Sequence, residues 1–128
     1  MNWKLEVVVV PVSDVDRAKA FYTEGAGFEL DHDVSPGGEM RIVQLTPPGS
    51  SCSIVIGAGV GSMEPGSLQG IQLVVPDIAA ARSELMERQV AVSEVQQMGP
   101  PDRDGSKFAF FKDPDGNGWS VQEIRSRD

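Results

Sequence analysis

A short pattern occurs twice in this chain and constrains its fold more than any other feature. Val12–Ala18 reads VSDVDRA, and Val75–Ala81, 63 residues later, reads VPDIAAA. Each copy follows a run of apolar residues. Internal repetition of this kind indicates one structural unit built twice. A duplicated unit often surrounds a shared concave site, so the repeat also indicates where a ligand would bind.

The size and charge of the chain limit the classes of function. Its 128 residues suffice for one compact domain with a core of its own. Acidic residues outnumber basic ones 19 to 11 and the basic residues are scattered, which argues against nucleic acid and favours a cationic small molecule as partner. The lone Cys52 excludes an intrachain disulfide. Without a signal peptide or a long apolar span, we expect no membrane association and a cytoplasmic location.

The first unit is predicted to contain one helix among four strands. The β-branched run Leu5–Val10 is typical of a buried strand. Ser13 or Asp14 can cap a helix that ends near Gly25 and Gly27. The apolar stripe of that helix is Val15, Ala18, Phe21 and Tyr22. Turn residues separate the remaining strands, which are Phe28–Val34, Met40–Leu45 and Ser51–Ile56.

The second unit repeats this order after a stretch rich in Gly, Pro and Ser. Asp77 is the predicted helix cap, and the helical stripe is Ile78, Ala81 and Leu85. The predicted strands are Ile71–Val75, Val90–Val95, Lys107–Phe111 and Trp119–Ile124. The chain is therefore predicted to be a single domain of two βαβββ modules, residues 4–56 and 71–124, joined by a linker at 57–70.

This order of elements predicts an α+β fold. Each helix needs a sheet to cover its apolar stripe, so each module becomes a four-stranded sheet with a helix on one face. If the two sheets meet, their helix-free faces form a half-open, mostly antiparallel barrel. The cavity between the modules is then the expected ligand site.

Two segments resemble the vicinal oxygen chelate superfamily, which includes glyoxalase I, bleomycin resistance proteins and extradiol dioxygenases. They are Val10–Tyr22, read VPVSDVDRAKAFY and followed by Gly27 and Phe28, and Phe111–Asn117, read FKDPDGN. The resemblance covers nearly the whole chain and implies the glyoxalase-like fold. It also implies a homodimer, because members of this superfamily commonly pair two chains around their sites.

The resemblance implies positions for metal ligands, and this chain has no good ligand there. Seven residues before the two capping Asp residues stand Val7 and Gly70, and Ser120 stands four residues after Gly116. The remaining ligand would fall in 51–55, which has no carboxylate. Because Val and Gly offer no lone pair and a neutral Ser is a weak ligand, we expect no metal.

A non-standard site for Zn, Ni or Mn would have to use other residues. The candidates are Glu6, Gln72 and Glu123. Glu6 and Glu123 require a register shift, which points a strand side chain toward the helices unless a bulge intervenes. An extradiol dioxygenase is excluded as the main hypothesis because its iron needs two His, and His32 is the only one here.

Counting by twos along the strands gives the residues expected to face the cavity. They are Val7, Val9, Ser53, Val55, Gly70, Gln72, Ser120 and Gln122. This uncharged lining suits a small organic molecule better than acid–base or metal chemistry. We therefore expect a metal-free binding protein of the bleomycin resistance type. Two alternatives stay open, a metal-dependent glyoxalase-like lyase or isomerase and a metal-free enzyme.

Overall fold

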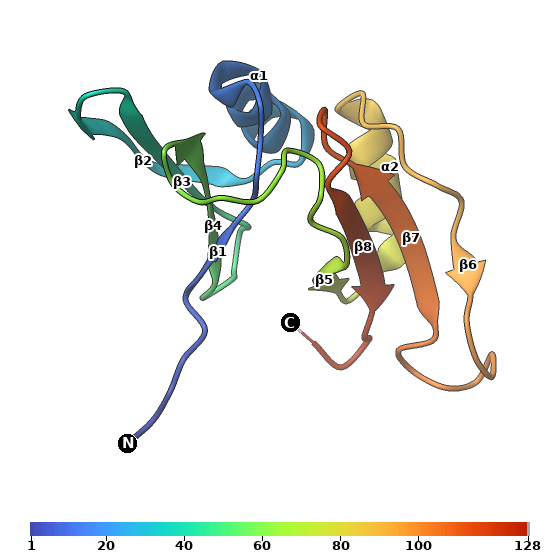
Figure 1. Cartoon of the computed structure of the whole chain (residues 1–128). Coiled ribbons are helices and arrows are strands. Elements are labelled where there is room, and N and C mark those ends of the chain that lie inside the picture. Colours follow the sequence, from blue (N-terminus) through green and yellow to red (C-terminus); the bar gives the residue numbers. More distant parts are fainter. Residues whose placement is uncertain (128) are drawn as a thin grey trace.

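The chain folds into two separate four-stranded sheets, each with a helix on one face (Figure 1). The computed structural model describes residues 1–127. The strands of the first sheet are β1 (Val7–Val9), β4 (Ser53–Ala58), β3 (Met40–Thr46) and β2 (Glu29–Gly37), in that spatial order. Those of the second are β5 (Ile71–Val75), β8 (Gly118–Glu123), β7 (Lys107–Lys112) and β6 (Gln96–Gln97). The predicted α+β fold of two modules is confirmed, and within the described residues no strand pairing closes the sheets into a barrel.

Both sheets have the same mixed pairing. β1 runs parallel to β4, and β5 runs parallel to β8, while the other neighbours are antiparallel. A parallel pair needs a long crossover connection, and in each module the helix lies within it. The repeated sequence pattern therefore corresponds to a repeated topology.

The two copies of the pattern begin their helices in the same way. The Asp14 carboxylate accepts a hydrogen bond from the Arg17 N–H at 3.1 Å, and Asp77 accepts one from Ala80 N–H at 3.1 Å. These side chains satisfy N–H groups that a helix start leaves unpaired. They open α1 (Val15–Ala20) and α2 (Ile78–Glu87), so Asp14 rather than Ser13 is the first cap. Within residues 1–127, neither of these helices nor any other is long and apolar enough to cross a membrane.

The first helix ends in a wider turn than the sequence predicts. After Ala20 the chain forms the π-helical turn η1 (Phe21–Gly25), in which the Ala26 N–H reaches Phe21 O at 2.9 Å. Such turns are rare and often mark a local requirement of packing. Here Tyr22, within that turn, is fully buried. Gly27 has the predicted left-handed backbone, with φ of 76°.

The apolar core lies between the helices and the sheets and includes both modules. On each sheet, alternate residues enter it, as the period of a half-buried strand requires. From the first sheet these are Val43, Leu45, Ile54 and Ile56; from the second, Ala109, Phe111, Trp119 and Val121. The intervening residues lie on the helix-free faces, where a ligand can reach them.

One turn in the second module holds the first module in place. The turn 113–117 follows β7, and the Asn117 amide donates to Pro11 O at 2.8 Å. The Ser13 hydroxyl donates to the Asp115 carboxylate at 2.6 Å. Tyr22 donates to Asp113 at 2.7 Å. The segment DPDGN is thus a structural connection between the modules.

The predicted strand Val90–Val95 is wrong. Only Val92 forms a bridge there, to Phe111, and the strand β6 follows later and is two residues long. Ser93 explains the interruption, because its hydroxyl accepts from the Phe110 N–H at 2.9 Å and its carbonyl accepts from Arg82 at 2.8 Å. A side chain thus replaces a ladder partner. β4 also runs to Ala58, two residues into the predicted linker.

Candidate functional site

The predicted cavity residues of the first sheet lie together on its helix-free face. Val7 pairs with Ser53, and Val9 pairs with Val55. Paired residues on neighbouring strands point to the same side of a sheet, so the four form one patch. Its only polar group is the Ser53 hydroxyl, which shares a hydrogen bond of 2.6 Å with Thr46. This patch can contact a ligand through apolar side chains, but it offers few groups for hydrogen bonding or catalysis.

Three predicted residues of the second sheet form a hydrogen-bonded row, called the glutamine row below: Gln72, Ser120 and Gln122. Gln72 pairs with Ser120, and the Ser120 hydroxyl donates to Gln72 Oε1 at 3.2 Å. Gln72 Nε2 then donates to Gln122 Oε1 at 2.7 Å. Gln122 in turn donates to the Gly105 carbonyl at 2.8 Å, which connects the row to the loop 98–106. The two glutamines therefore hold each other in a fixed orientation.

The loop 98–106 has its own anchor at the end of the second sheet. The Asp104 carboxylate accepts a hydrogen bond from the Arg125 N–H at 2.9 Å. That bond holds the pKa of Asp104 below its usual value, so the anchor stays charged at neutral pH. Two contacts therefore fix the loop: Gln122 on the sheet face bonds to Gly105, and Arg125, which follows β8, bonds to Asp104.

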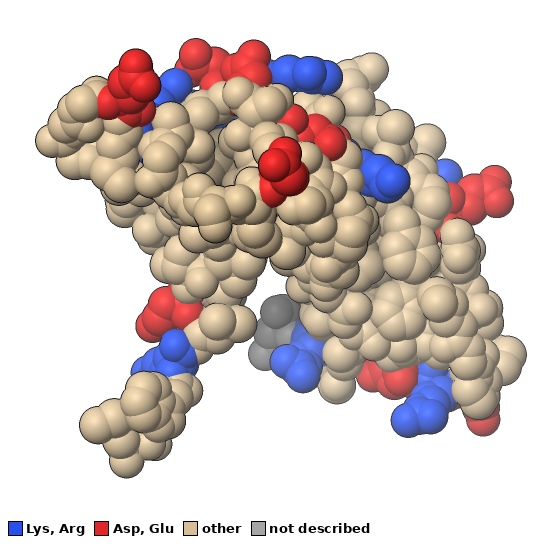
Figure 2. All heavy atoms as spheres, viewed as in Figure 1, with Lys and Arg blue, Asp and Glu red and all other residues tan. Residues whose placement is uncertain are grey.

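A hollow of about 600 Å³ lies against the second sheet. Three of the predicted residues line it, namely Gly70, Gln72 and Ser120. The other lining residues are Gln69, Ala91, Phe110, Phe111, Lys112, Gly118 and Trp119. Figure 2 shows the helix-free face of this sheet, which is formed mainly by uncharged residues with charged side chains toward its margins. An apolar lining with a few polar groups is typical of small-molecule sites.

The sequence analysis missed the aromatic and basic side chains of this hollow. Phe110 pairs with Ser120, and Phe108 pairs with Gln122, so residues 108, 110 and 112 share the face of the glutamine row. Phe110 is 36% exposed, and its ring stacks on Phe108 with 6.4 Å between centroids. Counting by twos along Lys107–Phe111 would have found them. Trp119 by contrast is buried in the core and only its margin reaches the hollow.

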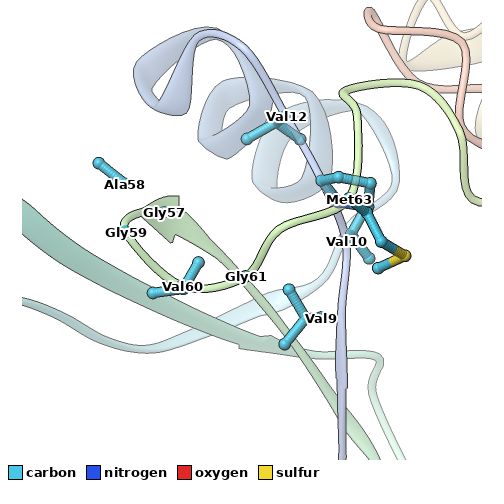
Figure 3. Close-up of a pocket in the computed structure, with 10 residues that line it drawn as sticks. Val9, Val10, Val12, Gly57, Ala58, Gly59, Val60, Gly61 and Met63 are labelled. Carbon is cyan, nitrogen blue, oxygen red and sulfur yellow. The ribbon is translucent and has the colours of Figure 1, made fainter.

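Val9 lines a second, smaller hollow of about 210 Å³ beside β1 (Figure 3). The facing segment is 57–63, in which Gly57, Gly59 and Gly61 alternate with residues of small or medium size. Every side chain drawn there is apolar, including Val60 and Met63. Among the described residues that line this hollow, no side chain can transfer a proton.

The residues present do not fit the metal centre that the superfamily resemblance implies. The carboxylate of Glu123 accepts from the Ile78 N–H at 3.0 Å, so it caps α2 on the opposite side of the sheet. Glu6 lies before β1 and is exposed. Gln72 is committed to its neighbours in the glutamine row. Within residues 1–127, no three His, Cys, Asp or Glu side chains come together.

His32 and Cys52 lie outside both hollows. His32 pairs with Gln44 on the exposed part of β2. Cys52 is half-buried, and its thiol faces its neighbour's carbonyl, Ser53 O, at 3.8 Å. In the part of the chain that the structure describes, neither side chain has a partner that would make it a base or a nucleophile.

Comparison with known proteins gives a consistent relationship over almost the full chain. The family model described as Glyoxalase/Bleomycin resistance protein/Dioxygenase superfamily matches residues 4–121. The protein YetH of Bacillus subtilis (strain 168) is 29% identical over 124 residues, which cover 94% of this chain and 98% of YetH.

Solved structures match at the level of both sequence and fold. TnmS3, described as an antibiotic binding protein from Streptomyces sp. CB03234, is 37% identical with a TM-score of 0.80, over 96% of this chain and 97% of TnmS3. A glyoxalase/bleomycin resistance protein from the same organism is 38% identical with a TM-score of 0.77, over 94% of this chain and 100% of that protein. Both the fold and the order of elements are therefore shared over whole chains.

Proposed function

Since this chain belongs to the Glyoxalase/Bleomycin resistance protein/Dioxygenase superfamily, we propose that it is a metal-free protein that binds a small organic molecule. The ligand would lie in the hollow against the second sheet, in contact with Gln72, Phe110 and Ser120. The protein would act by holding this molecule and would leave its bonds unchanged.

The observation that carries the proposal is the composition of the hollow. Its volume of about 600 Å³ is in the range of small-molecule sites. Phe110 supplies an aromatic surface, and the glutamine row supplies fixed polar groups beside it. Within the described lining there is neither a His nor a carboxylate to act as acid or base.

The relatives support a binding role. TnmS3 is described as an antibiotic binding protein, and more than a third of its residues are identical to those of this chain. The superfamily also contains enzymes, so the family alone leaves the role open. The donor set supports binding, because Val7, Gly70 and Ser120 stand where the resemblance implies metal ligands.

We also propose a homodimer. Both helix-free faces expose apolar side chains, including Val7 and Val34 on the first sheet and Val74 and Phe110 on the second. Large apolar side chains left exposed on a sheet face are candidates for contact with another chain. A second copy would cover the first-sheet patch and add a second wall to the hollow.

A thermal-shift screen tests the binding role. Protein purified without chelator is heated with a panel of small organic antibiotics and, separately, with Zn, Ni and Mn salts. We expect organic compounds and not metal salts to raise the Tm, because a ligand at about 100 times its Kd adds about 2.7 kcal/mol to the folded state. Stoichiometric metal in the purified protein would contradict the metal-free part of the proposal.

Paired variants locate the site. Phe110→Ala removes an aromatic wall of the hollow, and the Tm rise given by the best compound should fall by more than half. Met86→Ala is the control, because Met86 is an exposed apolar residue on α2, which covers the opposite face of the sheet. Equal Tm rises in both variants would place the ligand elsewhere.

A further inference from the structure

Lys112 is the only charged residue in the described lining of the larger hollow. It is the last residue of β7. Phe110 stands two residues earlier on the same strand, so both side chains lie on the same face of the sheet. The side chain of Lys112 is exposed. Among residues 1–127, none of the ion pairs includes Lys112, whereas Lys19 and Arg41 are paired with acidic side chains.

The other polar groups of the hollow leave both donors and acceptors available to a ligand. Gln72 Oε1 already accepts from Ser120, and Gln122 Oε1 already accepts from Gln72. An amide nitrogen carries two N–H groups, so Gln72 keeps one donor after its bond to Gln122. A lysine ammonium carries three donors and no acceptor. Gln69 Nε2 already donates to the carbonyls of Gly66 and Gly116, so Gln69 offers an acceptor, and Lys112 supplies the one charged donor of the described lining.

Resting on the proposed binding function, we infer that Lys112 selects ligands that combine an aromatic or apolar body with an anionic oxygen, such as a carboxylate. The body lies against Phe110, and the anionic oxygen accepts from Lys112 Nζ and from the remaining N–H of Gln72. Charge-assisted hydrogen bonds of this kind are stronger than neutral ones. An aromatic cation in the same place meets the like charge of Lys112.

The net charge of the whole chain supports the opposite preference. Its −8 favours a cationic small molecule as partner, and that expectation stays a prediction. Inside the hollow the local charge decides, because exposed charges more than about 10 Å away are largely screened at ordinary salt. Lys112 belongs to the lining, while no acidic residue does.

Three compounds with one ring system test the inference: 2-naphthoate, 2-naphthamide and 2-naphthylmethylammonium. They are anionic, neutral and cationic, and their binding is measured by NMR titration of the backbone amides and the Gln72 side-chain amide. We expect naphthoate to bind about tenfold more tightly than naphthamide, and the ammonium compound to bind most weakly. Lys112→Gln should remove the advantage of naphthoate and leave the affinity for naphthamide within twofold.

Lys107→Gln is the matched control. Lys107 is on the same strand as Lys112 but an odd number of residues away, so its side chain lies on the other face of the sheet. Its substitution changes the net charge by the same amount. It should keep the preference for naphthoate. If all three compounds bind at the hollow with equal affinity, or if Lys112→Gln keeps the preference, the inference fails while the binding function stands. If none of them shifts the hollow resonances, both are overturned.

Discussion

Asp113 is the side chain at which the two modules are joined most tightly. Its buried carboxylate accepts from Tyr22 OH at 2.7 Å, from Asn117 Nδ2 at 2.8 Å, and from the N–H groups of Asp115 and Asn117. Trp119 Nε1 completes the group by donating to Tyr22 OH at 3.0 Å. Burial and the neighbouring carboxylate raise the pKa of Tyr22 well above its ordinary value, so the hydroxyl remains a donor.

Asp113→Asn should therefore be strongly destabilising. The new amide nitrogen would face the Tyr22 hydroxyl and the Asn117 amide, both of which donate to this position. We expect the free energy of unfolding to fall by about 2–4 kcal/mol, measured by urea denaturation. Asp102→Asn in the exposed loop is the control and should change it by less than about 0.5 kcal/mol. Equal stability of the two variants would show that the network contributes nothing.

At the residue scale, strand parity was enough to predict which side chains share the face of the candidate site. Gln72, Ser120 and Gln122 could be predicted because a side chain two residues along a strand returns to the same face. Lys112 and Phe110 were missed because they stand on a strand that the superfamily resemblance does not use for ligands. The hydrogen bond from Gln122 to Gly105 depends on a loop conformation, for which the sequence has no periodic signal.

At the scale of elements, charged side chains connect α1 to the strands β2 and β3 of the first sheet. Asp33 on β2 accepts from Arg41 on β3 through two nitrogens, at 3.0 and 2.8 Å, and from Lys19 on α1 at 2.9 Å. The hydrogen bonds from Arg41 and then from Lys19 hold the pKa of Asp33 well below its usual value. The same Arg41 also pairs with Asp16 at 2.8 Å.

This cluster predicts a pH dependence of stability. Because the pKa of Asp33 is lower in the folded chain than in the unfolded one, its contribution is present at neutral pH and is lost as the pH falls below about 4. Asp33→Asn should lower the Tm at neutral pH, and the difference from the unsubstituted protein should shrink in acid. Differential scanning calorimetry at several pH values measures this. Glu39→Gln, in the exposed turn between β2 and β3, should show no such difference at any pH.

The elements themselves were predictable where one physical signal dominates. Asp14 and Asp77 identified both helix starts because a short carboxylate before an apolar stripe favours a cap. The prediction of a strand at Val90–Val95 was wrong because β propensity indicates a half-buried surface and does not show whether a strand has a hydrogen-bonded partner. Here the Ser93 hydroxyl takes the place of that partner. The π-turn at Phe21–Gly25 follows from the packing of Tyr22, which involves a residue nearly 100 positions away.

At the scale of the whole molecule, the segment before β1 extends away from both sheets (Figure 1). It contains Trp3, which is 87% exposed, and Leu5, which is 75% exposed. Large apolar side chains on an extended segment favour association with another surface. In the proposed homodimer, the segment of each chain would pack on the partner.

Tryptophan fluorescence can test that arrangement. The chain has two Trp residues, and Trp119 is buried within one chain while Trp3 is not. If the dimer covers Trp3, dilution below the dissociation constant should shift the emission maximum to longer wavelength. Trp3→Phe should abolish the shift, and sedimentation velocity should show the dimer mass at high concentration. A monomer mass at all concentrations would contradict the homodimer.

The turn 113–117 has a consequence for how the chain matures on the ribosome. The Tyr22 hydroxyl, the Pro11 carbonyl and the Ser13 hydroxyl find their partners about 100 residues later in the sequence. Contacts of such long range delay folding, and an incomplete core exposes apolar surface. The first module, although it is made first, therefore completes these contacts only after the turn 113–117 has been synthesised.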